Sequence, residues 1–511
     1  HLNLTASYTD PSALPRYRHH FRTIQVDWHQ TGHLAALVEE LPLTETRQTN
    51  EIELFNLKKL VLRSKAFFVE EYEMDAFVEV LSNCHNLTEL DLPGDVLCHN
   101  ADMVEYFLEK IEQLPNLQRL VLSDANVDAW VAHHLLKVCF KHPQLVDLQC
   151  DFTIADFRYP IMPTKDVCDP QFAILLKSLQ DADNMRTDAA EPTGLRLKSL
   201  MLPLINGGYP QDFLFPFLRS HVPYLERLDM PCVHRDYDGR DLKDAILEGC
   251  PRLQHITANY FLGLGDGRCG INNVIRDCIP MGLRTFRGKC TCNDTNQGEC
   301  QEVMQSLLDR HATTLEEFEL WGCDHIRSIH LHSVLAKCRK LKSFRVTRHV
   351  QQGIAFQDAL ISSWICHDIQ QLYLFFDRRF YLSPLCTVTH EAKVREGKEA
   401  YAQIGRLIKL EELGLGHIMG DFALEDLTLE AGWLGELAGL KELRHFHVLT
   451  DLWASMGQAE VEFMVTNWPK LEKISVDTHN DEYYVHAMLS KPHWQWLKEK
   501  WPGIVLTWNV L

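Results

Sequence analysis

The stretch that decides the fold is LTELDL, residues 87–92, because the same pattern precedes it as LKKLVL from Leu57 and follows it as LQRLVL from Leu117. The pattern places apolar residues at its first, fourth and sixth positions. Eleven of the thirteen intervals between copies are 26 to 33 residues long, which is typical of a leucine-rich repeat. The fourteen copies begin at Leu57, Leu87, Leu117, Leu145, Leu197, Leu225, Leu253, Leu283, Leu315, Leu341, Ile369, Leu410, Leu443 and Leu471.

Helical patterns lie between the predicted strands. Apolar residues recur at intervals of three and four residues over 75–84, 102–114, 241–250 and 459–468. Each repeat is therefore expected to be a strand, a turn, a helix and a turn. Helices are wider than the strand spacing of about 4.8 Å, so the stack bends. The sequence predicts an α/β leucine-rich-repeat solenoid (a horseshoe) with parallel strands on the concave face and helices on the convex face.

The predicted domain organisation is one long repeat domain behind a short N-terminal region. Residues 1–50 are expected to be an N-terminal cap or the truncated remainder of an upstream region, with FRTIQV from Phe21 as a degenerate first copy. Residues 51–511 are expected to hold about 14 repeats, with insertions near 152–196 and 376–409. The second insertion is expected to protrude as a loop over 378–397, and GIVLTW near the C-terminus to form a closing strand.

Composition limits the classes of partner. The chain has 511 residues and a formal net charge of −19. Because a protein this acidic repels phosphate backbones, we expect no nucleic acid partner. No run of about 18 apolar residues is present, so no membrane partner is expected. The 16 cysteines are spread along the chain, which favours reduced thiols and a cytoplasmic or nuclear location. The chain begins with His1, without a signal-peptide pattern, and is expected to be a fragment or a processed product.

Cysteines at the predicted helix ends carry a family resemblance. Cys84, Cys250, Cys338 and Cys366 each stand three residues before a strand pattern, as in NCHNLTEL and KCRKLKSF. In this the chain resembles the cysteine-containing leucine-rich repeats of F-box proteins, and more broadly the ribonuclease-inhibitor-like repeat proteins abundant in fungi. The resemblance implies substrate recognition for an SCF-type ubiquitin ligase, with an F-box, not visible in this chain, docking the SCF adaptor. The alternative is a free-standing regulator or inhibitor with no ligase link.

Motifs that could indicate catalysis or cofactors are better explained by the repeat. Gly265, Gly267 and Gly270 match a dinucleotide-binding pattern but keep the repeat register, and the expected acidic residue is missing. Cys290 and Cys292 lie near Cys300 without a zinc-finger spacing. No motif of a catalytic nucleophile or a phosphate-binding loop occurs. We therefore expect no enzyme activity, no metal and no cofactor.

Binding is expected on the concave face, through the side chains that point away from the core. These stand at the third, fifth and seventh positions of the pattern. Aromatic residues and arginine dominate interface hot spots, which singles out three neighbouring repeats. The competing interpretation places the aromatics beneath the 378–397 loop. The predicted partner-binding residues are Trp321, Arg345, Tyr373, Phe375, Glu319, Arg287 and Lys289.

Overall fold

The computed structural model shows two compact units built from parallel strands and helices. One unit comprises residues 1–256 and 278–281, and the other comprises 257–277 and 282–511. The structure describes residues 2–4, 22–27, 57–63, 77–78, 81–82, 84–93, 101–123, 135, 138–139, 141–150, 195–201, 211–230, 239–259, 270–280, 282–289, 297–321, 326–346, 353–377, 389–417, 428–430, 432–449, 456–478 and 492–510.

Every copy of the repeat pattern forms a strand, and consecutive strands pair in parallel within each unit. The strands of the first unit are β1 (Leu2–Leu4), β2 (Thr23–Asp27), β3 (Lys59–Arg63), β4 (Glu89–Pro93), β5 (Arg119–Ser123), β6 (Asp147–Cys150), β7 (Ser199–Met201) and β8 (Arg227–Met230). Strand β9 (His255–Asn259) begins in the first unit and ends in the second. The second unit continues with β10 (Thr285–Lys289), β11 (Glu317–Trp321), β12 (Ser343–Val346), β13 (Ile354–Ala355), β14 (Gln371–Asp377), β15 (Glu412–His417), β16 (His445–Leu449), β17 (Lys473–Thr478) and β18 (Val505–Val510).

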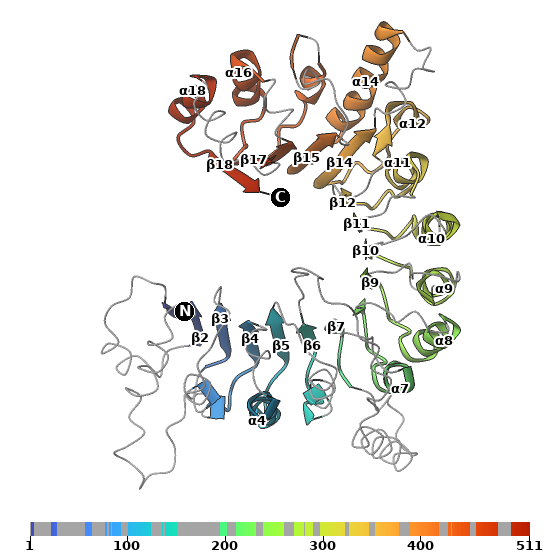
Figure 1. Cartoon of the computed structure of the whole chain (residues 1–511), viewed down its shortest axis with the longest axis vertical. Helices are drawn as coiled ribbons and strands as arrows, with labels where there is room; N and C mark the ends of the chain where they lie inside the picture. Colours follow the sequence, from blue (N-terminus) through green and yellow to red (C-terminus); the bar gives the residue numbers. More distant parts are fainter. Residues whose placement is uncertain are drawn as a thin grey trace. The chain divides into compact units, whose positions relative to one another are not determined.

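The helices lie together on one side of the strands in each unit (Figure 1). The predicted helices at 102–114, 241–250 and 459–468 are found with small shifts of their ends, and residues 77–78 and 81–82 of 75–84 are helical. The helices are α4 (Ala101–Glu112), α7 (Gln211–His221), α8 (Gly239–Gly249), α9 (Gly270–Asp277), α10 (Gln297–His311), α11 (Ser328–Lys337), α12 (Phe356–Ala359), α14 (His390–Gly405), the 3-10 helix η6 (Leu434–Leu437), α16 (Gln458–Asn467) and α18 (Pro492–Lys500).

The core follows the leucine register. The first residue of each copy is 0 to 2% exposed, and the described residues at the fourth and sixth positions are buried as well. In β14, buried and half-buried side chains alternate along the strand, as expected when one face packs on helices and the other does not. The predicted α/β leucine-rich-repeat solenoid is therefore confirmed. We call the sheet surface away from the helices the strand face.

A backbone relay aligns one repeat with the next just before each strand. The carbonyl of Lys58 accepts hydrogen bonds from the backbone N–H groups of both Thr88 and Glu89, each at 2.9 Å. The carbonyl of Gln370 does the same for Glu411 and Glu412. These bonds satisfy backbone groups that would otherwise be buried without partners, and they hold the register of the outward side chains.

The cysteines at the helix ends belong to the core. Cys84, Cys250, Cys338 and Cys366 are fully buried free thiols. Burial raises the pKa of each to about 12, so none is a reactive thiolate near neutral pH. The carbonyl of Cys84 accepts the N–H of Leu87, which closes the turn into the strand, and Cys250 does the same for Leu253.

Two strands at the N-terminal end extend the repeat register. The expected degenerate copy from Phe21 is confirmed as β2, in which Ile24 and Val26 align with Leu60 and Leu62 of β3. Strand β1 precedes it and was not predicted. The expected closing strand is confirmed as β18, which pairs with β17. The division of the chain at residue 50 and the 152–196 insertion stay predictions, since residues 151–194 lie outside the described segments.

The predicted protruding loop over 378–397 is wrong in its second part. Residues 390–397 open the sixteen-residue helix α14, whose N-cap Thr389 accepts a hydrogen bond from the N–H of Ala392 at 3.3 Å. The segment contains a glycine, Gly397, and glycine is unfavourable inside a helix. The helix tolerates it because the Trp433 indole packs where a Cβ would stand, 2.1 Å from Cζ2. Residues 378–388 lie outside the described segments.

Candidate functional site

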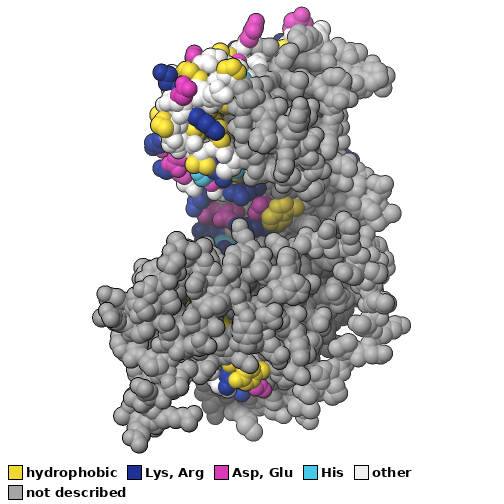
Figure 2. All heavy atoms as spheres, turned by 60° about the vertical axis from the view of Figure 1, so that its left-hand side comes forward, with side chains coloured by type: hydrophobic (Ala, Val, Ile, Leu, Met, Phe, Trp, Pro, Cys, Tyr) yellow, Lys and Arg dark blue, Asp and Glu magenta, His cyan; other side chains and the backbone are white. Residues whose placement is uncertain are grey.

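The candidate site lies on the strand face of the second unit. Cross-strand pairing arranges its outward side chains in rows, one residue from each strand. The fifth-position row runs through Arg287, Glu319, Arg345, Tyr373, Gly414, His447, Ser475 and Thr507. The third-position row runs through Thr285, Glu317, Ser343, Gln371, Glu412, His445, Lys473 and Val505. Figure 2 shows cationic and anionic side chains intermingled on one face, with hydrophobic side chains beside them.

Arg287 begins a group of charged side chains that pair across neighbouring strands. One guanidinium nitrogen lies 3.1 Å from Glu317 and another lies 3.4 Å from Glu319. Burial raises the pKa of the Glu319 carboxyl, while Arg287 and Arg345 oppose that rise by favouring its charged form. Glu319 is therefore held between two arginines in a poorly solvated position.

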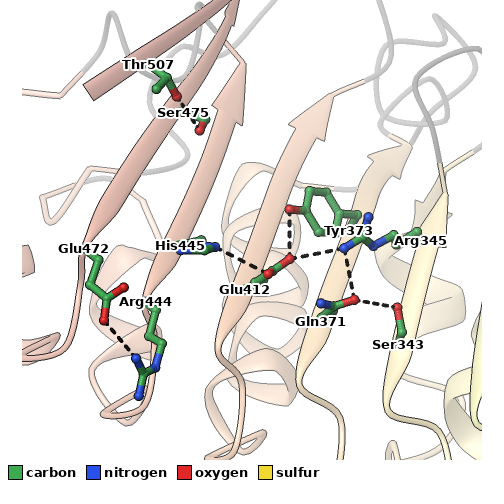
Figure 3. Close-up of polar contacts among 10 residues, drawn as sticks. All are labelled: Ser343, Arg345, Gln371, Tyr373, Glu412, Arg444, His445, Glu472, Ser475 and Thr507. Atoms are coloured by element: carbon green, nitrogen blue, oxygen red, sulfur yellow. Dashed lines mark hydrogen bonds and ion pairs between the residues drawn. The ribbon is translucent and has the colours of Figure 1, made fainter. Parts of the chain in front are cut away.

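Arg345 joins this group to a second one on the next strands (Figure 3). Its Nη2 donates to the side-chain oxygen of Gln371 at 3.0 Å and to the carboxylate of Glu412 at 3.2 Å. The guanidinium also stacks over the ring of Tyr373, 4.8 Å from its centroid. Such stacking contributes about 0.5–1 kcal/mol at exposed sites and more where water is excluded. Four side chains from β12, β14 and β15 thus fix the orientation of one another.

Glu412 is the acceptor at the centre of this network. Besides Arg345, it accepts a hydrogen bond from the Tyr373 hydroxyl at 3.3 Å and lies 3.4 Å from Nδ1 of His445. The leucine register predicted the outward position of Glu412 but gave no reason to select it. Its role comes from its cross-strand neighbours, which the register could have indicated because Gln371 pairs with Glu412 and Glu412 with His445.

A glycine on the next strand admits the ring of Tyr373. A Cβ built on Gly414 would stand 2.2 Å from Cδ1 of Tyr373, far inside van der Waals contact. Since position 414 offers no side chain, the Tyr373 ring reaches across β15 and packs on His447 of β16, with 5.1 Å between ring centroids. The tyrosine therefore bridges three strands of the strand face.

Trp321 and Phe375 differ from the other aromatic residues. Each stands at the seventh position of its repeat, at the end of β11 or near the end of β14, and each is half-buried. Neither has a ring contact, cation–π contact or side-chain hydrogen bond with any residue in the described ranges. Core rings such as Phe318 stack on both neighbours, Phe286 at 6.0 Å and Phe344 at 5.4 Å.

The structure places the seven predicted partner-binding residues on four strands of one unit, β10, β11, β12 and β14. Arg287 is exposed, and Glu319, Trp321, Arg345, Tyr373 and Phe375 are half-buried. Lys289 pairs in register with Trp321, and nothing is described of its side chain. The residues that the prediction missed are Gln371, Glu412 and His445.

A second ladder of charges crosses the strand face of the first unit. Lys59 lies 2.8 Å from Glu89, and Arg119 lies 3.7 Å from Glu89 and 3.1 Å from Asp147. The charges alternate from β3 to β6. Like the group around Arg287, the ladder pairs cations with carboxylates across strands, but it contains no aromatic residue.

Small outward residues are covered by their neighbours, which corrects the simple rule that every outward position is open. Val61 and Val121 stand at fifth positions and are 5% and 6% exposed. Each is flanked in its row by longer polar residues, among them Asp91 between the two valines. Ser475 is fully buried and shares a 2.7 Å hydrogen bond with Thr507.

Other functional features are sparse in the segments that the structure describes. Within them no group of three or more histidines, cysteines and carboxylates is placed to hold a metal ion. No helix in these segments is long and apolar enough to cross a membrane. The glycine motif lies outside the described residues up to Gly270, where α9 begins, as do Cys290 and Cys292.

Comparisons with known proteins give weak likenesses. No family model matches the chain, and no curated protein matches it. Among solved structures, TLR13 in its complex with ssRNA13 is 12% identical, with a TM-score of 0.27 over 96% of this chain and 67% of that one. The leucine-rich-repeat-containing protein LegL7 from Legionella pneumophila is 11% identical, with a TM-score of 0.28 over 81% of this chain and 93% of that one. The repeat register, parallel pairing and burial described above identify the chain as an α/β leucine-rich-repeat solenoid.

Proposed function

We propose that the chain is a non-catalytic scaffold that binds a partner protein on the strand face of its second unit. The observation that carries the proposal is the network of Arg345, Tyr373 and Glu412, which holds aromatic and cationic groups in fixed orientations on the strand face. Preorganised side chains lose less conformational entropy on binding than mobile ones. Tyrosine and arginine are also enriched among residues that dominate interface energies.

The arrangement does not favour a catalytic role. The titratable groups of the network already contact one another. Glu412 accepts a hydrogen bond from the Tyr373 hydroxyl and lies beside Nδ1 of His445. A general acid or base must instead reach the substrate proton. The adjacent carboxylates Glu316 and Glu317 bind different arginines, Arg284 and Arg287, as expected for strand neighbours that point opposite ways.

A finer version of the proposal concerns ubiquitin ligation. The cysteine-bearing repeats resemble those of F-box proteins, and on that likeness we propose substrate recognition for an SCF-type ligase. A free-standing regulator or inhibitor is the alternative. Affinity purification of the full-length protein separates the two, because only the ligase subunit brings down the SCF adaptor in stoichiometric amounts.

The strand-face proposal is tested by comparing two double variants in the same affinity purification. Arg345→Ala with Tyr373→Ala removes a cation and a large side chain from the strand face. Lys398→Ala with Ile408→Ala removes a similar pair from exposed positions on α14 and the turn after it. We expect the first variant to lose at least about tenfold of its bound partner, since hot-spot truncation costs more than about 1 kcal/mol, and the second to lose less than about twofold.

Circular dichroism of both variants checks that the fold is kept. A partner retained equally by both variants would refute binding through the strand face of this unit.

A further inference from the structure

The inference concerns the chemistry of the partner, and it rests on the proposed function. Trp321 and Phe375 lie on the same strand face as the Arg345 network but take no part in it. They share the seventh position of their repeats, on strands β11 and β14. At the fifth position these strands stand on either side of β12, two strand spacings or about 10 Å apart, and each aromatic residue follows two residues later along its strand.

The two arginines near these aromatics are already paired with carboxylates. Arg287 is matched by Glu317 and Glu319, and Arg345 by Glu412. A charged partner would have to displace an existing ion pair to gain a new one. Such an exchange gains little net energy, because the pair that is broken offsets the pair that is formed, and partly exposed pairs are worth about 0–1 kcal/mol. Charge recognition is therefore a weak source of affinity at this surface.

Unlike the paired charges, the two aromatic side chains offer apolar surface that a partner can bury. Their half-buried rings have no aromatic neighbour among the described residues, so covering them removes apolar surface from water at about 25 cal/mol per Å². The Trp321 indole N–H also lacks an acceptor among the described side chains and backbone groups. A partner can therefore bury both rings and accept one hydrogen bond without breaking any contact already made.

We propose that Trp321 and Phe375 bind an uncharged, apolar peptide segment of the partner protein, with the paired charges from Arg287 to Glu412 as its rigid floor. The segment supplies two large aliphatic or aromatic side chains about 10 Å apart and a carbonyl or hydroxyl oxygen for the indole N–H. The paired charges hold this surface in one conformation. They also disfavour segments with unpaired charges, because a charged group would lose its water on binding and gain no new ion pair in return.

A peptide library displayed on phage and selected against the full chain tests this. We expect enrichment of Leu, Ile, Phe and Trp and depletion of Asp, Glu, Lys and Arg. For a selected synthetic peptide, calorimetry should give a Kd that changes less than about twofold between about 50 and about 500 mM salt. Trp321→Ala and Phe375→Ala should each weaken binding at least about tenfold.

Matched variants keep the inference open to refutation. Trp321→Phe keeps the apolar surface but loses the indole N–H, and should weaken binding about threefold to tenfold, the effect of one hydrogen bond. Lys398→Ala, which removes an exposed cation of α14 away from the strand face, should change the Kd less than about twofold.

Three results would overturn the inference: failure to select any peptide, binding unchanged by both aromatic substitutions, or selected peptides rich in charge whose affinity falls steeply with salt. Charged peptides that still require Arg345 and Tyr373 would overturn only this inference. The proposed function fails separately, when the natural partner is retained by the Arg345→Ala, Tyr373→Ala variant.

Discussion

The ring of Tyr373 occupies the place where position 414 would carry a side chain, with Cδ1 only 2.2 Å from the Cβ that any residue other than glycine would have. The ring is held there from three sides. Arg345 stacks over it, Glu412 accepts a hydrogen bond from its hydroxyl, and His447 packs against it. Gly414 thus decides the orientation of a tyrosine that stands one strand away.

Gly414→Ala should destabilise the chain by about 1–3 kcal/mol, the usual effect of forcing extra atoms into a packed site. Urea unfolding of the wild type, G414A, Y373A and the double variant measures the coupling. In the Y373A background the alanine meets no ring, so the cost of Gly414→Ala should fall to within about 0.5 kcal/mol of zero. Equal costs in the two backgrounds would show that the tyrosine does not depend on this glycine.

Gly397→Ala should also destabilise, although glycine to alanine inside a helix usually stabilises by about 1 kcal/mol. The reason is the Trp433 indole, which lies 2.1 Å from the new Cβ and donates its N–H to the carbonyl of Val394 at 3.0 Å. Gly435→Ala is the control, since nothing lies within 4 Å of a Cβ there. A rise in the thermal midpoint of G397A would contradict this packing.

Acid should weaken the fold through His311. This buried histidine accepts the N–H of Leu283 at Nδ1 (3.1 Å), while Nε2 contacts the carbonyl of Ile275 at 2.7 Å. Its neutral form is therefore required. Burial lowers its pKa below the ordinary 6.5, so the unfolded chain takes up the proton first. The stabilisation is complete above pH 6.5 and is lost as the pH falls through the folded-state value.

His311→Asn keeps an acceptor for Leu283 and removes the titrating ring. Unfolding curves at about pH 7.5 and about pH 5.5 should show a smaller loss of stability in H311N than in the wild type. Parallel losses would mean that His311 contributes nothing to the acid response.

The ladder in the first unit should respond to charge and to salt. Arg119→Glu places a third carboxylate between Glu89 and Asp147 and should lower stability by about 1 kcal/mol at low ionic strength. Because Arg119 and Glu89 are 35% and 39% exposed, salt reaches them, and about 0.5 M salt should remove part of that loss. Arg119→Gln should show a smaller and less salt-sensitive loss. A cost for R119E that does not change with salt would exclude an electrostatic origin.

The fold was predictable because the same pattern positions are apolar in every repeat and face the core. Residues such as Leu90 and Phe446 stand at pattern positions and are fully buried. The strands that were missed are short and lack the pattern: β1 has three residues, and β13 has two that pair with Phe376 and Asp377 at the end of β14. The first part of helix α14 was missed because the long interval between two repeats was interpreted as a protruding loop, and the contact of Gly397 with Trp433 appears only in the structure.

The site was predictable in its positions but not in its contacts. The register placed Arg345 and Tyr373 outward on neighbouring strands, as the structure shows. It could not show that their common acceptor is Glu412, because that depends on the rotamers of side chains 67 residues apart in sequence. Nor could it show that Tyr373 leans over Gly414, since alternation specifies the face of a side chain and not its direction within that face.

Photo-crosslinking from single positions tests the central claim most directly. The photoreactive residue benzoylphenylalanine replaces Phe375 on the strand face or Ile408, which is 61% exposed before β15. After irradiation with the purified partner, the account predicts covalent adducts from position 375 and none above background from position 408. Adducts from position 408 with none from 375 would contradict it.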